Sequence, residues 1–347
     1  EDFSRLISSS LDNIYYLELE EADKDDKDVP VLLENSKFTS SFESLTSMYA
    51  LPRYNEIDPT PYLAPFYVLF FGMMGADLGY GLVMLIGSIY VLKKFNLKDS
   101  TEKFVRFFFY LSFSVMLWGL IYGSIFGLDL PMKKLINPSE DYMTILVISI
   151  ILGIFHIYFG LALSAYINIR DGNIIDAIFD VGFWFMALTG GIIYLLSAVV
   201  AISGLIKDMA FWVMIAGMVG IVATGGRTSK SIGAKLGGGI YSLYGISSYV
   251  GDFVSYSRLM ALGMSGGFIA GAINMIAKML AEKGIIGIVL GLVIFVGGQI
   301  FNLGLSLLSA YVHSIRLIFV EFFGKFYEGG GKGFNLFINK PKYINLK

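Results

Sequence analysis

The chain has 347 residues, of which 55% are hydrophobic and only 16% are charged, and its formal net charge is −2. Soluble domains carry about a quarter charged residues, so this composition predicts an all-α, polytopic membrane protein with a small soluble part. The balanced charge gives no reason to expect a nucleic-acid partner, and the lack of cysteine excludes disulfides and thiolate metal sites. With only two histidines, His156 and His313, a metal site or another cofactor is not expected.

Residues 1–62 are the only clearly soluble stretch. Its proline-rich run from Pro52 to Pro61 breaks regular structure and predicts a stiff lead-in to the membrane. Because the chain begins at Glu1 without a methionine or an apolar signal segment, we expect 1–62 to be the remnant of a cytoplasmic N-terminal region and its lead-in. A membrane domain over 63–338 and a C-terminal tail over 339–347 would follow.

Seven apolar blocks follow the lead-in, at 63–93, 104–127, 141–169, 176–202, 207–223, 240–281 and 285–326. In the first block, four glycines surround Asp77, a density that favours a broken helix and predicts a helical hairpin. A hairpin gives about eight transmembrane helices and places residues 1–62 on the cytoplasmic side with the lysine-rich loops. A single crossing of the first block would place them outside.

The last block carries a polar stripe whose members are three or four residues apart, so they share one helix face: Gln299, Asn302, Ser306, Ser309, His313 and Arg316. The preceding block contains a second intramembrane arginine, Arg258. A charged residue near the bilayer centre costs roughly 2.5–3.5 kcal/mol on insertion scales, so it normally faces protein or water and marks function. The stripe therefore predicts one wall of an aqueous ion path.

The charged residues near this path have a functional and a structural interpretation. Arg258 could serve the ion path, or it could snorkel or pair with Asp252, which lies one and a half turns earlier. Glu321 follows the stripe and could be an ion entrance on the cytoplasmic side or an interfacial residue. Asp77 is expected to be a turn residue, and a place on a water path is the alternative.

The uncharged members of the stripe have the same two interpretations. Gln299 and Asn302 are costly to bury, which favours a role as polar lining or as hydrogen-bonding groups between helices. Ser309 more often bonds a carbonyl of its own helix than lines a pore. A histidine such as His313 packs between helices about as readily as it lines a channel.

Glycines predict where helix backbones approach each other in the membrane. Gly263, Gly267 and Gly271 are spaced by four residues on the segment that carries Arg258, and Gly287 and Gly291 repeat this spacing in the last block. Small residues at that spacing allow close helix packing in lipid.

Three runs carry a resemblance to a known family: NEIDPTPYLAPFYVLFFGMMGADLGYG (55–81), VGDFVSYSRLMALGMSGG (250–267) and LSAYVHSIRLIFVEFFGKFYEGGGKGF (308–334). They resemble the membrane domain of the stator subunit of V-type and A-type rotary ATPases, called subunit a or subunit I. The resemblance covers about residues 29–337. It implies eight membrane helices, the last two long and tilted, pressed against a rotating ring of proteolipid subunits.

The resemblance also implies roles for particular residues. Arg258 matches the arginine that faces the ring carboxylates, Arg316 matches a second arginine beside it, and His313 precedes Arg316 as in many members. Ser306 departs from some eukaryotic relatives, which carry an acidic residue there, so the details of the ion path are not transferred.

The function that the resemblance implies is a non-catalytic stator subunit that forms two half-channels for H⁺ or Na⁺. Its partners would be the proteolipid ring, the central-stalk and peripheral-stalk subunits and the lipid bilayer. The sequence has no phosphate-binding loop of the GxxxxGK[ST] type, so the energy would come from partner subunits. Its lysine- and isoleucine-rich composition suggests a bacterial plasma membrane. The competing classes are a self-contained secondary transporter and a membrane scaffold without an ion path.

Overall fold

The structure is a computed structural model that describes residues 2–10, 16, 18, 29–131, 134–138, 140–198, 200, 203–227 and 231–334. Most of the segment 11–28 and the whole predicted tail, 339–347, lie outside these residues.

The described residues are almost entirely helical, as the composition predicts. The helical elements are α1 (Asp2–Ser10), η1 (Thr39–Phe42), α2 (Glu43–Tyr49), α3 (Thr60–Gly75), α4 (Leu78–Lys94), α5 (Asp99–Tyr122), α6 (Tyr142–Arg170), α7 (Ile174–Asp176), η2 (Ala177–Gly182), α8 (Phe183–Leu196), α9 (Gly204–Thr224), α10 (Ile232–Ser255), α11 (Ser257–Ala281), α12 (Ile285–Arg316), η3 (Leu317–Phe322) and η4 (Phe323–Lys325). Four short strands accompany them: β1 (Pro30–Val31), β2 (Ser124–Ile125), β3 (Leu128–Asp129) and β4 (Lys332–Gly333).

Six helical runs within the described part of the chain are long and apolar enough to cross a membrane. They are Asp99–Tyr122, Tyr142–Arg170, Ile174–Leu196, Gly204–Thr224, Gly237–Ala281 and Ile285–Lys325. The last two, of 45 and 41 residues, far exceed the roughly 20 residues that a perpendicular crossing needs. The prediction of a polytopic helical protein that ends in two long helices is confirmed.

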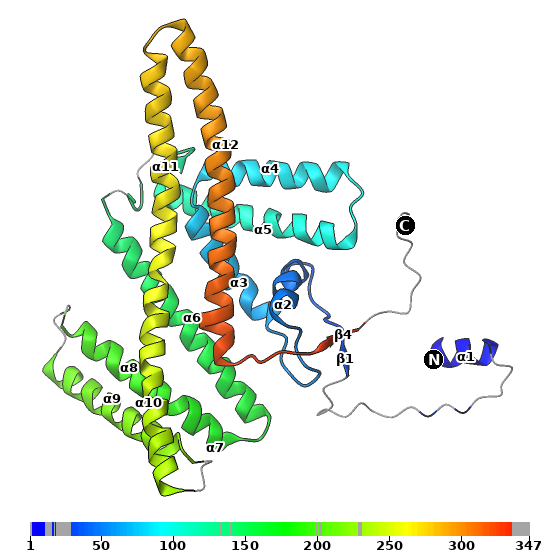
Figure 1. The fold of residues 1–347 in the computed structure, drawn as a ribbon, viewed down its shortest axis with the longest axis vertical. Helices are drawn as coiled ribbons and strands as arrows, with labels where there is room; N and C mark the ends of the chain where they lie inside the picture. Colours follow the sequence, from blue (N-terminus) through cyan, green and yellow to red (C-terminus); the bar gives the residue numbers. More distant parts are fainter. Residues whose placement is uncertain are drawn as a thin grey trace.

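The first apolar block is broken at Ala76 and Asp77, which separate α3 from α4. The two halves then diverge. α4 packs along α5, to which a short loop joins it, whereas α3 packs against α5, α11 and α12. The antiparallel pair in this region is therefore α4 with α5, and it runs crosswise to the long helices (Figure 1).

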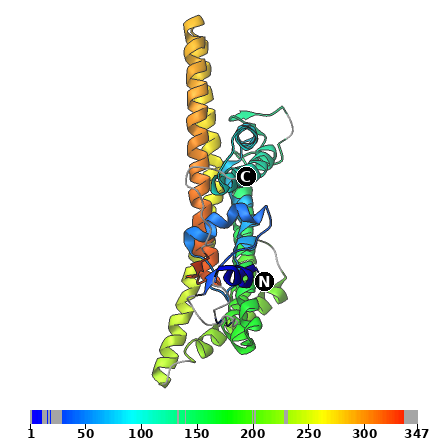
Figure 2. The ribbon, with the colours of Figure 1, turned by 90° about the vertical axis from the view of Figure 1, so that its right-hand side faces the viewer.

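The long helices α10, α11 and α12 form one layer of the molecule. α11 continues the direction of α10 after an interruption at Tyr256, and Gly284, with a φ of +89°, turns the chain back into α12. α3 and α6 pack against one face of this layer. In Figure 2 the layer stands along one edge of the molecule, so its outer face is open.

Glycines bring α11 and α12 together at the end they share. A Cβ atom on Gly291 would lie 2.6 Å from the carbonyl oxygen of Ala277, and one on Gly287 would overlap the carbonyl of Leu280. Gly263 meets the backbone of α3 in the same way. In contrast, Gly267 and Gly271 face open space. Of these five glycines, Gly263, Gly287 and Gly291 confirm the prediction of close helix packing.

The lead-in is joined to the segment after α12 by a strand pair and a hydrogen bond. β1 pairs with β4 in parallel, with Pro30 opposite Lys332 and Val31 opposite Gly333. The Tyr327 hydroxyl donates to the carbonyl oxygen of Ala50 at 2.6 Å. The lead-in is thereby fastened to the end of the helix that carries the polar stripe.

Candidate functional site

Arg258 lies two residues after the interruption between α10 and α11. It is half-buried, and its Nη1 is buried without a hydrogen-bond partner among the described residues. Arg316 and Glu321, from the end of α12 and from η3, are close enough to act electrostatically on it, and His313 is close to both arginines. The structure thus brings Arg258 together with a second arginine, a histidine and a carboxylate that follow it by 55 to 63 residues in the chain.

The interruption itself is anchored from inside the bundle. The Tyr256 side chain is fully buried and its hydroxyl is 2.7 Å from Nδ1 of His156 on α6. The imidazole stacks against Phe322, with a centroid distance of 4.3 Å, and lies at the same distance from Phe66. His156 therefore packs between helices, and through Tyr256 it fixes the backbone next to Arg258.

Glu321 is a buried carboxylate, with 1% of its surface exposed. It belongs to the π-helical turn η3 that continues α12, and such wide turns often occur at functional sites. Ser255 is close enough to the carboxylate to interact with it, whereas Oε2 has no hydrogen-bond partner among the described residues. A buried carboxylate with an oxygen that lacks a hydrogen-bond partner can accept a proton or another small cation.

Asp252 does not pair with Arg258. Its carboxylate instead binds the ammonium group of Lys325, at 2.5 Å, and the exposed fractions of the two side chains are 13% and 12%. The Lys325 Nζ also lies 3.9 Å from the centre of the Tyr249 ring. The structural interpretation of Arg258 as the partner of Asp252 is therefore wrong, and Arg258 keeps its charge available.

Gln299 and Asn302 belong to a buried hydrogen-bond network that joins α12 to α4 and α11. The Tyr80 hydroxyl donates to Oε1 of Gln299 at 2.5 Å and accepts from Nδ2 of Asn302 at 2.8 Å. Nε2 of Gln299 donates to Oδ1 of Asn274 at 2.7 Å and to the Phe126 carbonyl at 3.0 Å. This geometry matches the expected hydrogen bonding between helices.

Asp77 extends this network to the start of α4. Its carboxylate accepts from the backbone N–H of Tyr80, Phe126 and Gly127 and from the Ser124 hydroxyl, at distances from 2.8 to 3.1 Å. It caps the helix and holds the β2–β3 turn, in which Phe126 has a φ of +49°. A role for Asp77 in the turn is confirmed.

The polar stripe changes character along α12. Gln299 and Asn302 are fully buried, Ser309 and His313 are half-buried, and Arg316 is exposed. Nδ1 of His313 is buried without a hydrogen-bond partner in the described part of the chain. The stripe thus runs from an interhelical network to an open surface, and Oδ1 of Asn302 is also buried without a hydrogen-bond partner in the described residues.

Sequence patterns missed three participants of these clusters. Lys325 follows the stripe by more than two turns, and Tyr80 and Asn274 lie on other helices, so none of them belongs to a periodic polar pattern. The single signal was the spacing of Lys325 four residues after Glu321, which places both on one side of a helical turn.

Comparisons with known proteins agree with this fold. Residues 7–132 match the model of the V-type ATPase 116kDa subunit family. The chain is 35% identical over 375 residues to the A-type ATP synthase subunit I of Methanocaldococcus jannaschii, covering 97% of this chain and 53% of that protein. The corresponding protein of Pyrococcus horikoshii is 35% identical over 346 residues, covering 96% of this chain and 51% of that protein.

A bacterial relative is less similar. The V-type ATP synthase subunit I of Borreliella burgdorferi is 29% identical over 289 residues, covering 78% of this chain and 47% of that protein. The more similar relatives are archaeal, so the expected bacterial origin is not supported. The chain spans about half the length of the curated relatives it matches. It belongs to the V-type ATPase 116kDa subunit family, together with the A-type and V-type ATP synthase subunits I.

Proposed function

We propose that this chain is the ion-translocating membrane part of a rotary ATPase stator, and that Arg258 is the fixed cation of its path for H⁺ or Na⁺. The observation that supports the proposal most directly is the half-buried guanidinium of Arg258, which has one buried nitrogen without a hydrogen-bond partner in the described residues. Because the side chain is only half-buried, part of its charge remains accessible to an acceptor supplied by another subunit.

The acceptor would be a carboxylate on a rotating ring of proteolipids. Such a carboxylate can move through lipid only when a proton or a metal cation neutralises it, because an unpaired charge in hydrocarbon is costly. At about 4 Å and an effective dielectric constant near 20, an arginine would attract the ionised carboxylate by ~4 kcal/mol. This attraction releases the bound ion, and the same fixed charge repels ions that would leak between the two half-channels.

Arg316, His313 and Glu321 would complete the site from α12 and η3. Arg316 adds a second cation, and Glu321 offers a buried carboxylate to an ion approaching from the side of the lead-in. Ser309 and His313 would line the other half-channel, beyond which Gln299 and Asn302 close the gap between helices. In this role the chain performs no catalysis. The energy would come from the ATP-hydrolysing partners, which act on the ring through central-stalk and peripheral-stalk subunits.

The decisive variant is Arg258→Ala in the full-length subunit, assembled with its complex and reconstituted in vesicles. We expect ATP-driven ion uptake to be lost, because the ring carboxylates would retain their ions. Arg258→Lys should also fail, since a compact ammonium can lose its proton when buried.

Arg106→Ala is the matched control, because within the described residues Arg106 forms an ion pair with Glu102 alone, one turn away, and is substantially exposed. Full coupled uptake by the Arg258→Ala complex would overturn the proposal. Co-purification with a proteolipid ring separates this function from that of a transporter that works alone.

A further inference from the structure

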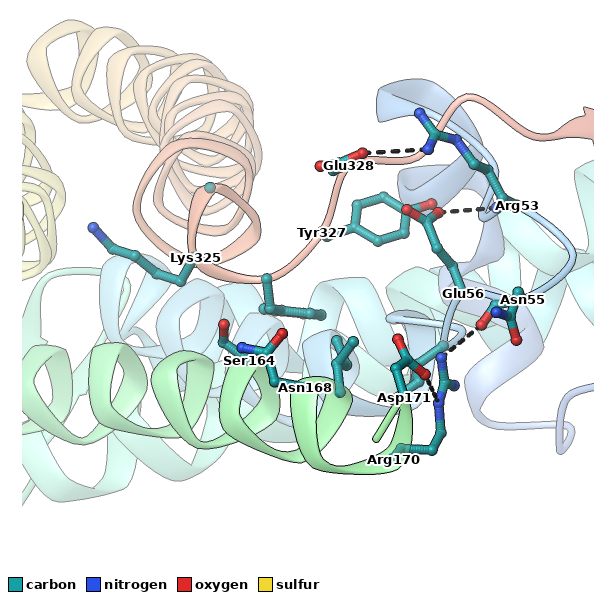
Figure 3. A pocket seen from close by; sticks show the side chains of 14 residues that line it. Arg53, Asn55, Glu56, Ser164, Asn168, Arg170, Asp171, Lys325, Tyr327 and Glu328 are labelled. Carbon is teal, nitrogen blue, oxygen red and sulfur yellow. Dashed lines mark hydrogen bonds and ion pairs between the residues drawn. The ribbon is translucent and has the colours of Figure 1, made fainter. Parts of the chain in front are cut away.

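A polar cavity of about 590 Å³ lies between the lead-in, the end of α6 and the segment after α12. Its walls include Arg53, Glu56, Ser164, Asn168, Lys325 and Glu328, and we refer to it as the lead-in cavity. Figure 3 shows Ser164 and Asn168 extending into it from α6, with Lys325 at one end and the Arg53–Glu328 pair at the other. Of the residues described at the candidate site, Lys325 alone lines it.

The charges on the cavity walls are already paired with each other. Arg53 lies 3.3 Å from Glu328, and Arg170 lies 2.9 Å from Asp171. Glu56 accepts from the backbone N–H of Arg53 at 2.9 Å. The walls are therefore polar but have no excess of one sign, which suits a water-filled passage better than a binding site for a charged ligand.

Lys325 connects the cavity to the candidate site. It lines the cavity, while its ammonium group is bound by Asp252 on α10. From this pair, two short rows of residues lead towards Arg258, one along α10 and α11 and the other along the turns that follow α12. Asp252, Ser255 and Arg258 are spaced by three residues, and Lys325 and Glu321 by four. Asp252 binds Lys325, Ser255 is close enough to interact with Glu321, and Glu321 acts electrostatically on Arg258.

We propose that ions pass between water and Arg258 through the lead-in cavity, and that the Lys325–Asp252 pair is a gate between the cavity and Glu321. The inference rests on the proposed function of this site. It places the water-facing end of one half-channel inside the stator subunit, between its own helices and its lead-in.

The chemistry of the pair explains how it would open. Asp252 is satisfied by one cation, the Lys325 ammonium. A proton or a sodium ion that reaches the carboxylate replaces that cation, and Lys325 is then free to turn towards the water of the cavity. Glu321, with its free Oε2, is the next acceptor on the way to Arg258. When the ion moves on, the ammonium returns to Asp252 and the gate closes.

Removing the charge of Asp252 and removing the charge of Lys325 should have unequal effects on ion uptake. In Asp252→Asn the ammonium group of Lys325 remains unpaired between the lead-in cavity and Glu321, where it repels every arriving cation. In Lys325→Gln the carboxylate remains available to the ion, so passage continues. A pair that serves only to hold two segments together would lose its contribution equally in both variants.

The first experiment uses the absence of cysteine from this chain, with any cysteine in the rest of the full-length subunit replaced by serine beforehand. Ser164→Cys places one nearly isosteric thiol on the cavity wall, and Ser47→Cys on α2 is an exposed control that lies outside the cavity. Reconstituted complexes are treated with a bulky, membrane-impermeant maleimide, and labelling is followed by the mass of the subunit. Uptake of H⁺ and of ²²Na⁺ is measured separately, so the ion that the passage carries is identified.

We expect labelled Ser164→Cys to lose ATP-driven uptake by roughly tenfold or more, because the adduct fills the passage, while labelled Ser47→Cys keeps it. A Ser164→Cys thiol that resists labelling, or one that is labelled with unchanged uptake, would overturn the cavity as the route. If Arg258→Ala still abolishes uptake in the same assay, the function of the site stands and only the route is wrong.

The second experiment compares the gate variants in assembled complexes. Asp252→Asn should lower uptake by roughly tenfold or more, Lys325→Gln should lower it severalfold less than Asp252→Asn does, and the double variant should recover part of the loss caused by Asp252→Asn. Equal losses in both single variants, or no recovery in the double variant, would show that the pair only holds the structure together.

Discussion

Replacing Gln299 by leucine separates a structural role of this residue from a role in lining the ion path. The side chain makes three well-formed hydrogen bonds, with the Tyr80 hydroxyl, Asn274 Oδ1 and the Phe126 carbonyl, at 2.5, 2.7 and 3.0 Å. Hydrogen bonds between membrane helices average about 0.6 and reach about 1.7 kcal/mol, so losing three should cost about 2–5 kcal/mol. Leucine is close in volume, so little of this cost comes from a cavity.

The measurement is the thermal unfolding of the purified complex, followed together with ATP-driven uptake at a temperature where it remains folded. We expect a clear loss of stability with uptake largely kept. Phe301→Leu is the control, because its side chain is 66% exposed on the same helix and should change little. If Gln299→Leu abolished uptake while stability was unchanged, Gln299 would act on the ion and the hydrogen-bond argument would be refuted.

Two further predictions concern packing and a surface charge. Gly291→Ala should destabilise the α11–α12 pair by about 1–3 kcal/mol, because its Cβ would meet the Ala277 carbonyl at 2.6 Å. Gly297 faces open space, so Gly297→Ala should be neutral or stabilise by up to ~1 kcal/mol. Equal melting temperatures of the two variants would contradict this expectation. Arg227→Ala removes ion pairs to Asp176 and Asp180, of which the hydrogen bonds to Asp180 contribute most to raising the pKa of Arg227. These groups are partly exposed, so we expect a loss below ~1 kcal/mol that high salt abolishes, measured as melting temperature against ionic strength.

The fold was largely predictable because the bilayer limits the alternatives. Long apolar blocks must become helices in lipid, and the glycines around Asp77 marked a break that the structure places at Ala76 and Asp77. What the pattern could not show is which helix packs beside which. α4 pairs with α5 instead of α3, and this choice depends on side-chain fit across elements that are distant in the sequence.

Helical spacing indicated which residues share a face of the candidate site, but it did not indicate which residues of other helices contact them. Helical spacing singled out Gln299, Asn302 and Arg316 as one face. It could not show that the face is covered at Gln299 and exposed at Arg316, since that depends on where α4 and α11 end against α12. The ion pair of Asp252 with Lys325 joins two helices 73 residues apart, beyond the reach of any local periodicity.

The tyrosine–histidine anchor at Tyr256 has a mechanical consequence for the long layer. Counting 1.5 Å per residue, Ala281 lies about 38 Å along the helix from Tyr256 and Arg258 only about 3 Å from it. If thermal bending tilted α11 by about 5° about Tyr256, the backbone at Ala281 would move by about 3 Å but that at Arg258 by only about 0.3 Å. Under the proposed function, the backbone at Arg258 would therefore stay almost in place when a rotating partner pushes on the far end of α11.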